Sequence, residues 1–187
     1  MDLDQSDFEK IIEFLSLENF FVDKNFSPKS IGDGQSNPTF LIRDNENNFK
    51  VLRTQPTGNL ARGAHRVDRE YFVLKALSNK SFEAPEPYVL CENSELIGRM
   101  FYVMNFEDGD INFDPFLPNE NLENKKKIYK SLAEVLGKLH SYDINELNLP
   151  FKKLGSFVSL RCGAGKNEGR HEDPSLKSDI QIGTTCH

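Results

Sequence analysis

Apolar residues recur at helical spacing in three stretches of the chain. The first is SDFEKIIEFLSLE, where Ser6 is placed to cap the amino terminus; the second is AHRVDREYFVLKALS; the third covers residues 121–140. Their apolar faces consist of Phe8, Ile11, Ile12 and Leu15, then of Val67, Tyr71, Leu74 and Leu77, and last of Ile128, Leu132, Val135, Leu136 and Leu139. The pattern predicts three amphipathic helices.

Short runs with strand character lie between these helices. They cover residues 30–32, 39–43, 49–53, 88–91 and 100–106, and the polar segment RDNENN separates the second run from the third as a hairpin turn. The expected order is one helix, three strands, one helix, two strands and one helix. Strand runs interrupted by a single helix favour an α+β lobe, in which an antiparallel five-stranded sheet packs against one helix, over a doubly wound parallel sheet.

The same pattern divides the chain into four parts. Residues 1–30 form an amino-terminal helix and lead-in, residues 31–110 the lobe with the sheet, and residues 111–154 a following segment with the third helix. From residue 155 the sequence GSFVSLRCGAGKNEGRHEDPSLKSDIQIGTTCH has few apolar residues and no sustained periodicity. We expect residues 155–187 to be a disordered tail that does not continue the domain.

Charge and composition narrow the function classes. The formal net charge of −6 and the pI of about 5.3 argue against nucleic acid and anionic membranes as partners. The three cysteines lack C-x-x-C spacing, which indicates a reducing compartment and no structural zinc, and no apolar run is long enough to span a membrane. The acidic start MDLDQSDFEK resembles neither a signal peptide nor a transit peptide, so a cytoplasmic location is the default expectation.

The segment IGDGQSNPTFLI, which begins at Ile31, is the first candidate for chemistry. Gly32 and Gly34 would let backbone N–H groups approach phosphate oxygens, and Ser36 would add a hydroxyl group. The segment matches neither GxxxxGK[ST] nor the complete GxGxxG pattern. An ordinary Gly/Asn/Pro turn between two strands is therefore the alternative.

Two charged residues are the next candidates. Arg53 shares one face of its strand with Phe49 and Val51, because side chains alternate along a strand, whereas Lys50 points to the other face. Glu70 falls inside the apolar stripe of the second helix, where a carboxylate needs a cationic partner. The alternatives are a strand-end Arg at the surface and a Glu that reaches solvent. We predict that Arg53 and Glu70 form an ion pair under the loop of residues 32–37.

Together these features match a kinase-type nucleotide site. A glycine-rich loop covers the phosphates, a cation on the third strand contacts them, and a helix Glu holds the cation in place. The segment FYVMNFEDGD then fits the hinge, where backbone groups of Met104, Asn105 and Phe106 would meet the edge of adenine.

The segments GQSNPTF, VLRTQPTG, AHRVDREYFVLKAL, FYVMNFEDGD and LGKLHSYD occur in an order that resembles the aminoglycoside phosphotransferase/choline kinase-like family. Within that family they are most similar to the kinase-like domain at the front of acyl-CoA dehydrogenase family members 10 and 11. The resemblance covers residues 31–149 and places Arg53 where kinases usually have lysine. It implies ATP and Mg²⁺, transfer to a hydroxyl group, and hydroxylated acyl chains or acyl-CoA as family substrates, with relatives in mitochondria or peroxisomes. The nucleotide-binding residues that it implies are Gly32, Gly34, Gln35, Ser36, Asn37, Val51, Arg53, Glu70, Met104, Asn105 and Phe106.

The catalytic loop of this family is an H-x-D-x-x-x-x-N motif in a helical lobe, followed by a metal-binding Asp. In this chain the segment HEDPSLKS offers His171 and Asp173, but Ser178 stands at the Asn position and Pro174 stiffens the segment. We therefore expect no catalytic and no metal-binding residue here, and a truncated kinase-like domain that is inactive as this chain. The alternative is a non-enzymatic binding or regulatory module that docks on a partner protein through its amino-terminal lobe. The apolar face of the third helix, if exposed, is a further candidate surface for a protein partner.

Overall fold

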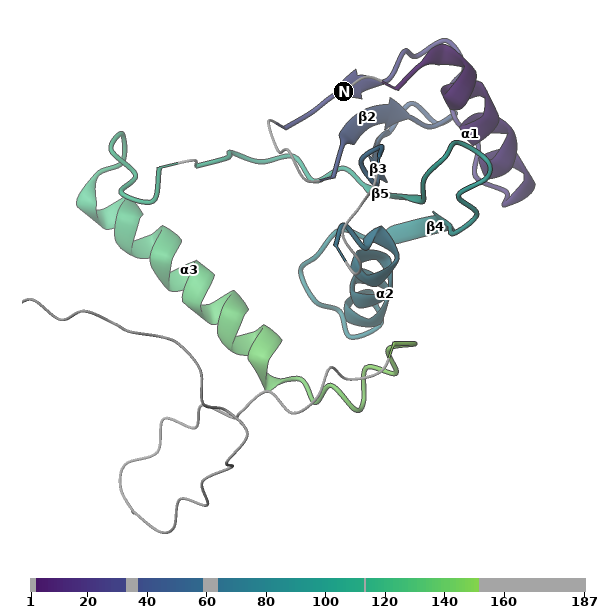
Figure 1. Ribbon diagram of the computed structural model, residues 1–187. Helices are drawn as coiled ribbons and strands as arrows, with labels where there is room; N and C mark the ends of the chain where they lie inside the picture. Colours follow the sequence, from purple (N-terminus) through teal and green to yellow (C-terminus); the bar gives the residue numbers. More distant parts are fainter. Residues whose placement is uncertain (1–2, 33–36, 59–63, 113, 152–187) are drawn as a thin grey trace, which may run out of the picture. The chain divides into compact units, whose positions relative to one another are not determined.

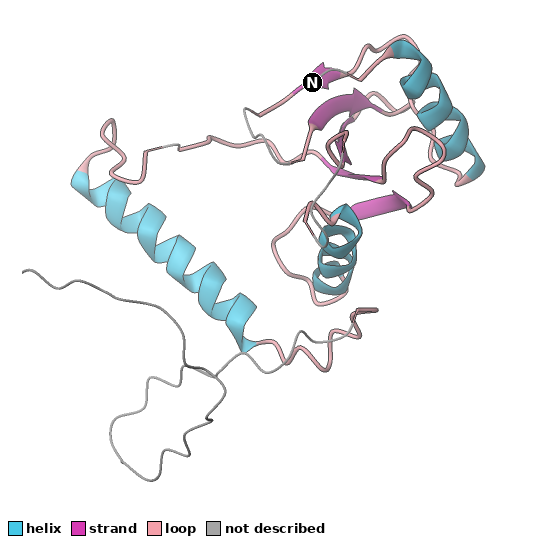
Figure 2. Cartoon of the chain, viewed as in Figure 1, coloured by secondary structure: helices cyan, strands magenta, loops and turns pink. Residues whose placement is uncertain are grey.

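A computed structural model of the chain describes residues 3–32, 37–58, 64–112 and 114–151. It confirms an α+β lobe built on an antiparallel five-stranded sheet with the strand order β1-β2-β3-β5-β4 (Figures 1 and 2). The elements are α1 (Gln5–Leu17), β1 (Lys29–Ser30), β2 (Thr39–Arg43), β3 (Phe49–Thr54), α2 (Val67–Ser78), β4 (Pro87–Cys91), β5 (Phe101–Asn105) and α3 (Leu122–Ser141). All the predicted elements form, with shifts of a few residues at their ends.

The hairpin of β2 and β3 is closed by the predicted polar turn. Asp44 Oδ1 accepts hydrogen bonds from the backbone N–H groups of Glu46 (3.0 Å) and Asn48 (2.8 Å), and Asn47 adopts a left-handed conformation with φ of 72°. Asn tolerates this conformation better than most residues, which fits its place in the turn. The turn is followed by a register in which Arg43 lies opposite Phe49.

One face of the sheet packs against α1 in a continuous apolar core. This core contains Phe8, Ile11, Ile12 and Leu15 of α1 together with Val22, Phe40, Ile42, Leu52, Cys91, Ile97, Phe101 and Val103. The helix is capped by Asp4, whose side chain accepts from the N–H of Asp7 at 2.7 Å. The prediction of Ser6 as the cap was wrong, because the helix begins at Gln5 and Ser6 lies inside its first turn.

The helix α2 covers the other face of the sheet. The rings of Tyr71 and Tyr102 meet edge to face, with their centroids 6.0 Å apart, and the Tyr71 hydroxyl donates to the backbone carbonyl of Tyr88 at 3.3 Å. Val67 at the start of α2 is fully buried. These contacts hold the first turn of α2 close to β5, which is the geometry that an ion pair between β3 and α2 requires.

The helix α3 has no buried residue. Its apolar stripe is exposed at several positions, with exposed fractions of 51% at Leu132 and 43% at Leu136.

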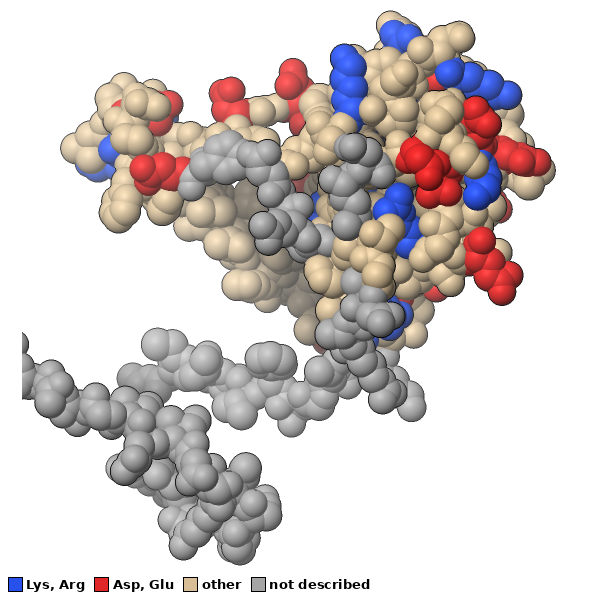
Figure 3. Space-filling view, turned by 45° about the horizontal axis from the view of Figure 1, so that its top comes forward, with Lys and Arg blue, Asp and Glu red and all other residues tan. Residues whose placement is uncertain are grey.

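Within the part of the chain that the structure describes, no helix is both long and apolar enough to cross a membrane. The predicted tail of residues 155–187 lies outside the described residues. On the face seen in Figure 3, acidic and basic side chains are intermixed.

Candidate functional site

Arg53 lies on β3, the central strand of the sheet. In the register of the three adjacent strands, Thr39 of β2 and Tyr102 of β5 are its direct partners on either side. Directly paired residues of antiparallel strands point to the same face, so these three side chains form a row on the face opposite α1. The row is closed on one side by a hydrogen bond of 3.0 Å from Arg53 Nη1 to Thr39 Oγ1.

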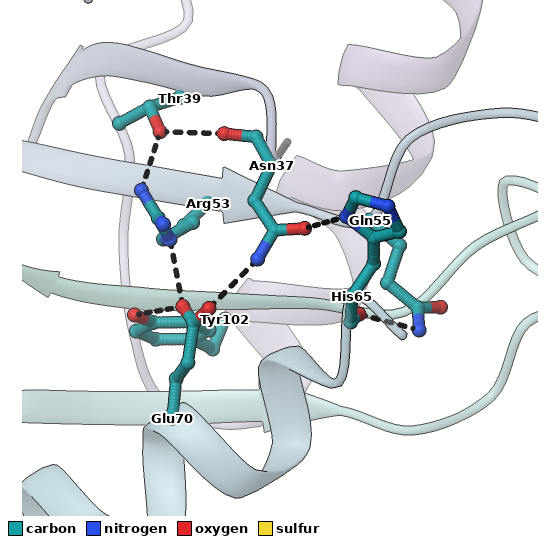
Figure 4. Close-up of polar contacts among 7 residues, drawn as sticks. All are labelled: Asn37, Thr39, Arg53, Gln55, His65, Glu70 and Tyr102. Atoms are coloured by element: carbon teal, nitrogen blue, oxygen red, sulfur yellow. Dashed lines mark hydrogen bonds and ion pairs between the residues drawn. The ribbon is translucent and has the colours of Figure 1, made fainter. Parts of the chain in front are cut away.

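Glu70 lies in the first turn of α2 and contacts this row. Its Oε2 accepts from Arg53 Nε at 2.7 Å, which confirms the predicted ion pair (Figure 4). The two side chains are 29% and 35% exposed. The pair is therefore more shielded from water than a surface salt bridge, but it is not fully desolvated.

Two neutral groups also hold the Glu70 carboxylate. The Tyr102 hydroxyl donates to Oε2 at 3.2 Å and Asn37 Nδ2 donates to Oε1 at 2.7 Å. Burial, and after it the negative charge of Glu70, raise the pKa of Tyr102 far above its usual value. The phenol therefore keeps its proton and remains a hydrogen-bond donor to Glu70.

These contacts close a ring of hydrogen bonds through four residues. The Thr39 hydroxyl accepts from Arg53 and donates to the backbone carbonyl of Asn37 at 3.0 Å, and the Asn37 side chain returns to Glu70. Figure 4 shows this ring, which joins residues from β2, β3, α2 and the segment before β2. Sequence reasoning found Arg53 and Glu70 but not Thr39 or Tyr102, because only strand register places those two beside Arg53.

The glycine-rich loop is described only at its ends. Gly32 has a φ of 84°, a left-handed conformation that favours glycine, and Gly34, Gln35 and Ser36 lie outside the described residues. Asn37 is 7% exposed, and the two ends of its side-chain amide are occupied by Glu70 and by His65 Nδ1, which lies 3.2 Å from Asn37 Oδ1. Its side chain is therefore bound to protein groups, although the sequence placed Asn37 among the nucleotide contacts.

Beside Arg53 the same face of the sheet continues with apolar side chains. Val51 is two residues before Arg53 on β3, is buried, and lies in register opposite Met104 of β5. Strand alternation places Val51 on the face of Arg53, as the sequence predicted. Apolar side chains next to a cation suit a ligand with a flat base and an anionic group.

In the expected hinge, polar groups of Asn105 already form hydrogen bonds within the protein. The backbone N–H of Asn105 donates to the carbonyl of Glu86 at 2.9 Å. The side-chain oxygen of Asn105 accepts from Lys50 Nζ at 2.9 Å and from the Tyr88 hydroxyl at 2.7 Å. Lys50 is buried on the face away from Arg53, as predicted. In this part of the chain, the backbone carbonyl of Asn105 and the groups of Phe106 are therefore the candidates for contacts to a base.

The described residues do not include a metal centre. Among them, no group of three or more His, Cys, Asp or Glu side chains is placed to hold a metal ion. His171, Asp173 and Ser178, the sequence match closest to a catalytic loop, lie outside the described residues.

An antiparallel sheet with a cation on its central strand, held by a carboxylate from the adjacent helix, defines the amino-terminal lobe of a kinase-like phosphotransferase. The chain belongs to the phosphotransferase enzyme family (APH), whose sequence profile matches residues 27–177. This confirms the family resemblance seen in the sequence. The match continues beyond residue 155, into the segment for which the sequence predicted a tail.

The chain is also similar to curated proteins that are named acyl-CoA dehydrogenases. The chain is 42% identical over 128 residues to "Probable acyl-CoA dehydrogenase IBR3" of Arabidopsis thaliana, a match that covers 66% of this chain and 16% of that protein. It is 43% identical over 116 residues to "Acyl-CoA dehydrogenase family member 11" of Rattus norvegicus, covering 62% of this chain and 15% of that protein. "Acyl-CoA dehydrogenase family member 10" of Mus musculus is 39% identical over 126 residues, covering 67% and 12%.

A structure from Ralstonia eutropha, described as a "putative aminoglycoside phosphotransferase", superposes with a TM-score of 0.59 at 28% identity. The superposition covers 76% of this chain and 40% of that one. The chain thus spans 16% or less of the length of these curated relatives, and less than half of the solved phosphotransferase.

Proposed function

We propose that this lobe binds a nucleoside triphosphate, with Arg53 as the cation that contacts its phosphates. The observation that carries the proposal is the Arg53–Glu70 pair at 2.7 Å on the central strand. Arg53 uses Nε for Glu70 and Nη1 for Thr39, and no described residue accepts from Nη2. A guanidinium held through Nε and Nη1, whose Nη2 donates to no described residue, suits a phosphate oxygen, because Arg recognises phosphate through directed hydrogen bonds.

In this proposal, the other candidate residues would contact the phosphates or the base of the nucleotide. Gly32, Gly34, Gln35 and Ser36 of the glycine-rich loop would offer backbone and side-chain donors to the phosphates. Val51 and Met104 would form the apolar surface for the base, with the Asn105 carbonyl and Phe106 at its edge. When ATP is bound it supplies the phosphoryl group, and the residues of this lobe orient it.

The phosphoryl acceptor and the metal ion in this proposal are inferred from the family resemblance and not from contacts of the described residues. We infer from the resemblance that the complete relatives transfer phosphate to a hydroxyl group on an acyl chain, in the free acid or its CoA thioester, with Mg²⁺. The 187 residues contain no H-x-D-x-x-x-x-N motif. Because that motif supplies the catalytic Asp and a metal-binding Asn, we propose that this chain by itself binds nucleotide without transferring its phosphate.

The test is calorimetric titration of the full chain with ATP and Mg²⁺, together with an assay for ATP consumption. Arg53→Ala should weaken ATP binding about tenfold or more, the loss expected for one charged hydrogen bond. Arg43→Ala is a matched control, since Arg43 is 31% exposed and paired with Asp23 at the other end of the same hairpin. Lys50→Ala should weaken binding less than Arg53→Ala because Lys50 faces away. Equal losses in Arg53→Ala and Arg43→Ala would contradict the proposal.

A second candidate function rests on α3. Its exposed apolar stripe, which includes Leu132 and Leu136, would serve as a docking surface for a partner protein. This candidate predicts concentration-dependent association in sedimentation experiments without nucleotide. A chain that binds ATP and remains monomeric would favour the first candidate.

A further inference from the structure

Asn37 contacts Glu70 of the Arg53–Glu70 pair, and His65 contacts Asn37. Asn37 is buried, its Nδ2 lies 2.7 Å from Glu70 Oε1, and its Oδ1 lies 3.2 Å from His65 Nδ1. A carboxylate oxygen only accepts hydrogen bonds, so the NH₂ group of Asn37 must face Glu70. Its oxygen then faces His65, and His65 Nδ1 must carry the hydrogen of that contact.

His65 is itself fixed at the start of α2. Its backbone has a φ of 55°, and its carbonyl accepts from Gln55 Nε2 at 2.9 Å and from the N–H of Val67 at 3.0 Å. Gln55 is buried and exchanges two further hydrogen bonds with the backbone of Met100, at 3.0 and 3.2 Å. A non-glycine residue stays in the left-handed region when its surroundings determine its position in this way.

We propose that Asn37 and His65 are positioning residues for the phosphate-binding cation, and this inference rests on the proposed function. Glu70 sets the direction of the Arg53 guanidinium, and Asn37 fixes the second oxygen of Glu70 so that the carboxylate cannot rotate. His65 keeps the Asn37 amide in the orientation that presents its NH₂ group to Glu70. Neither side chain needs to contact the nucleotide, because both act through Glu70 on Arg53.

The experiment measures the affinity of the full chain for adenosine, ADP and ATP. Asn37→Asp keeps the shape of the side chain but turns an acceptor toward Glu70, and it should weaken ADP and ATP binding about tenfold while leaving adenosine unchanged. His65→Ala should have the same selective effect, at about threefold. His65→Asn should restore wild-type affinity, since an Asn side chain offers an N–H near the place of Nδ1 and tolerates a positive φ.

The matched control is Asn48→Asp. Asn48 Nδ2 donates to the Asp44 carboxylate at 3.3 Å in the β2–β3 turn, so this variant creates the same carboxylate contact away from Arg53. It should leave the ratio of adenosine to ATP affinity unchanged, even if it lowers stability. A wild-type chain that prefers ATP, with the same preference in Asn37→Asp and His65→Ala, overturns the inference and leaves the proposed function intact. A wild-type chain with no preference for ATP over adenosine overturns both.

Discussion

Removing the two partners of the Arg53–Glu70 pair, singly and together, tests the geometry of the site without any ligand. Arg53→Ala deletes one hydrogen bond to a carboxylate and one to Thr39, and Glu70→Ala leaves three donors without their acceptor. A hydrogen bond to a charged group contributes about 1.5–3 kcal/mol and a neutral one about 0.5–1.5 kcal/mol. Because both side chains are about one-third exposed, solvent reduces these values. We expect each single variant to lose about 1–3 kcal/mol of unfolding free energy.

The pair itself should appear as a coupling of about 1–2 kcal/mol between the two substitutions. The measurement is urea denaturation of the four proteins of the double-mutant cycle, followed by circular dichroism and compared at a common m-value. Arg53→Ala combined with Arg43→Ala serves as the control, since these two side chains lie at opposite ends of the hairpin and should be additive. Additivity of Arg53→Ala and Glu70→Ala within about 0.4 kcal/mol, the usual limit for independent sites, would refute the reasoning.

Three further predictions follow from burial and charge. Leu15→Ala should cost about 2–5 kcal/mol by denaturation because Leu15 is fully buried in the core, whereas Leu17→Ala, at 77% exposure, should cost less than about 0.5 kcal/mol. Because the pKa of Tyr102 is raised, the folded chain keeps a proton that the unfolded chain releases above about pH 10. The free energy of unfolding should therefore fall as the pH rises past that value. Denaturation measured at several pH values should show a smaller fall for Tyr102→Phe. The purified chain should bind a hydrophobic dye, and replacing Leu132 and Leu136 with Gln should lower the dye fluorescence; unchanged fluorescence would show that α3 is not the binding surface.

The elements of the lobe were predictable because their signals are local. The periodicity of Ile11, Ile12 and Leu15 marks α1 as an amphipathic helix, and the polar turn around Asp44 marks the hairpin. Alternation along β3 separated Arg53 from Lys50, and the apolar surroundings of Glu70 required a partner for it. These arguments need only the spacing of residues along one element.

The rest of the site depends on contacts between elements. Thr39 and Tyr102 flank Arg53 through strand register, and His65 reaches Asn37 from a different loop. Such pairings depend on how separate segments meet, which a single sequence does not specify. The cap of α1 shows the same limit at short range, since Asp4 and Ser6 are both suitable cap residues and only the backbone decides between them.

Successive residues of the central strand β3 contribute to the apolar core and to the candidate site. Leu52 is fully buried against α1, while Arg53, the next residue, faces Glu70 on the other side of the sheet. A substitution that loosens Leu52 therefore displaces the backbone that carries Arg53. In a map of mutational tolerance across this strand, sensitive positions should follow one another without gaps, and they should not alternate as on a strand with one solvent-facing side. Loss of function at a single position of β3 will thus not reveal which face of the sheet was damaged unless stability is measured on the same variant.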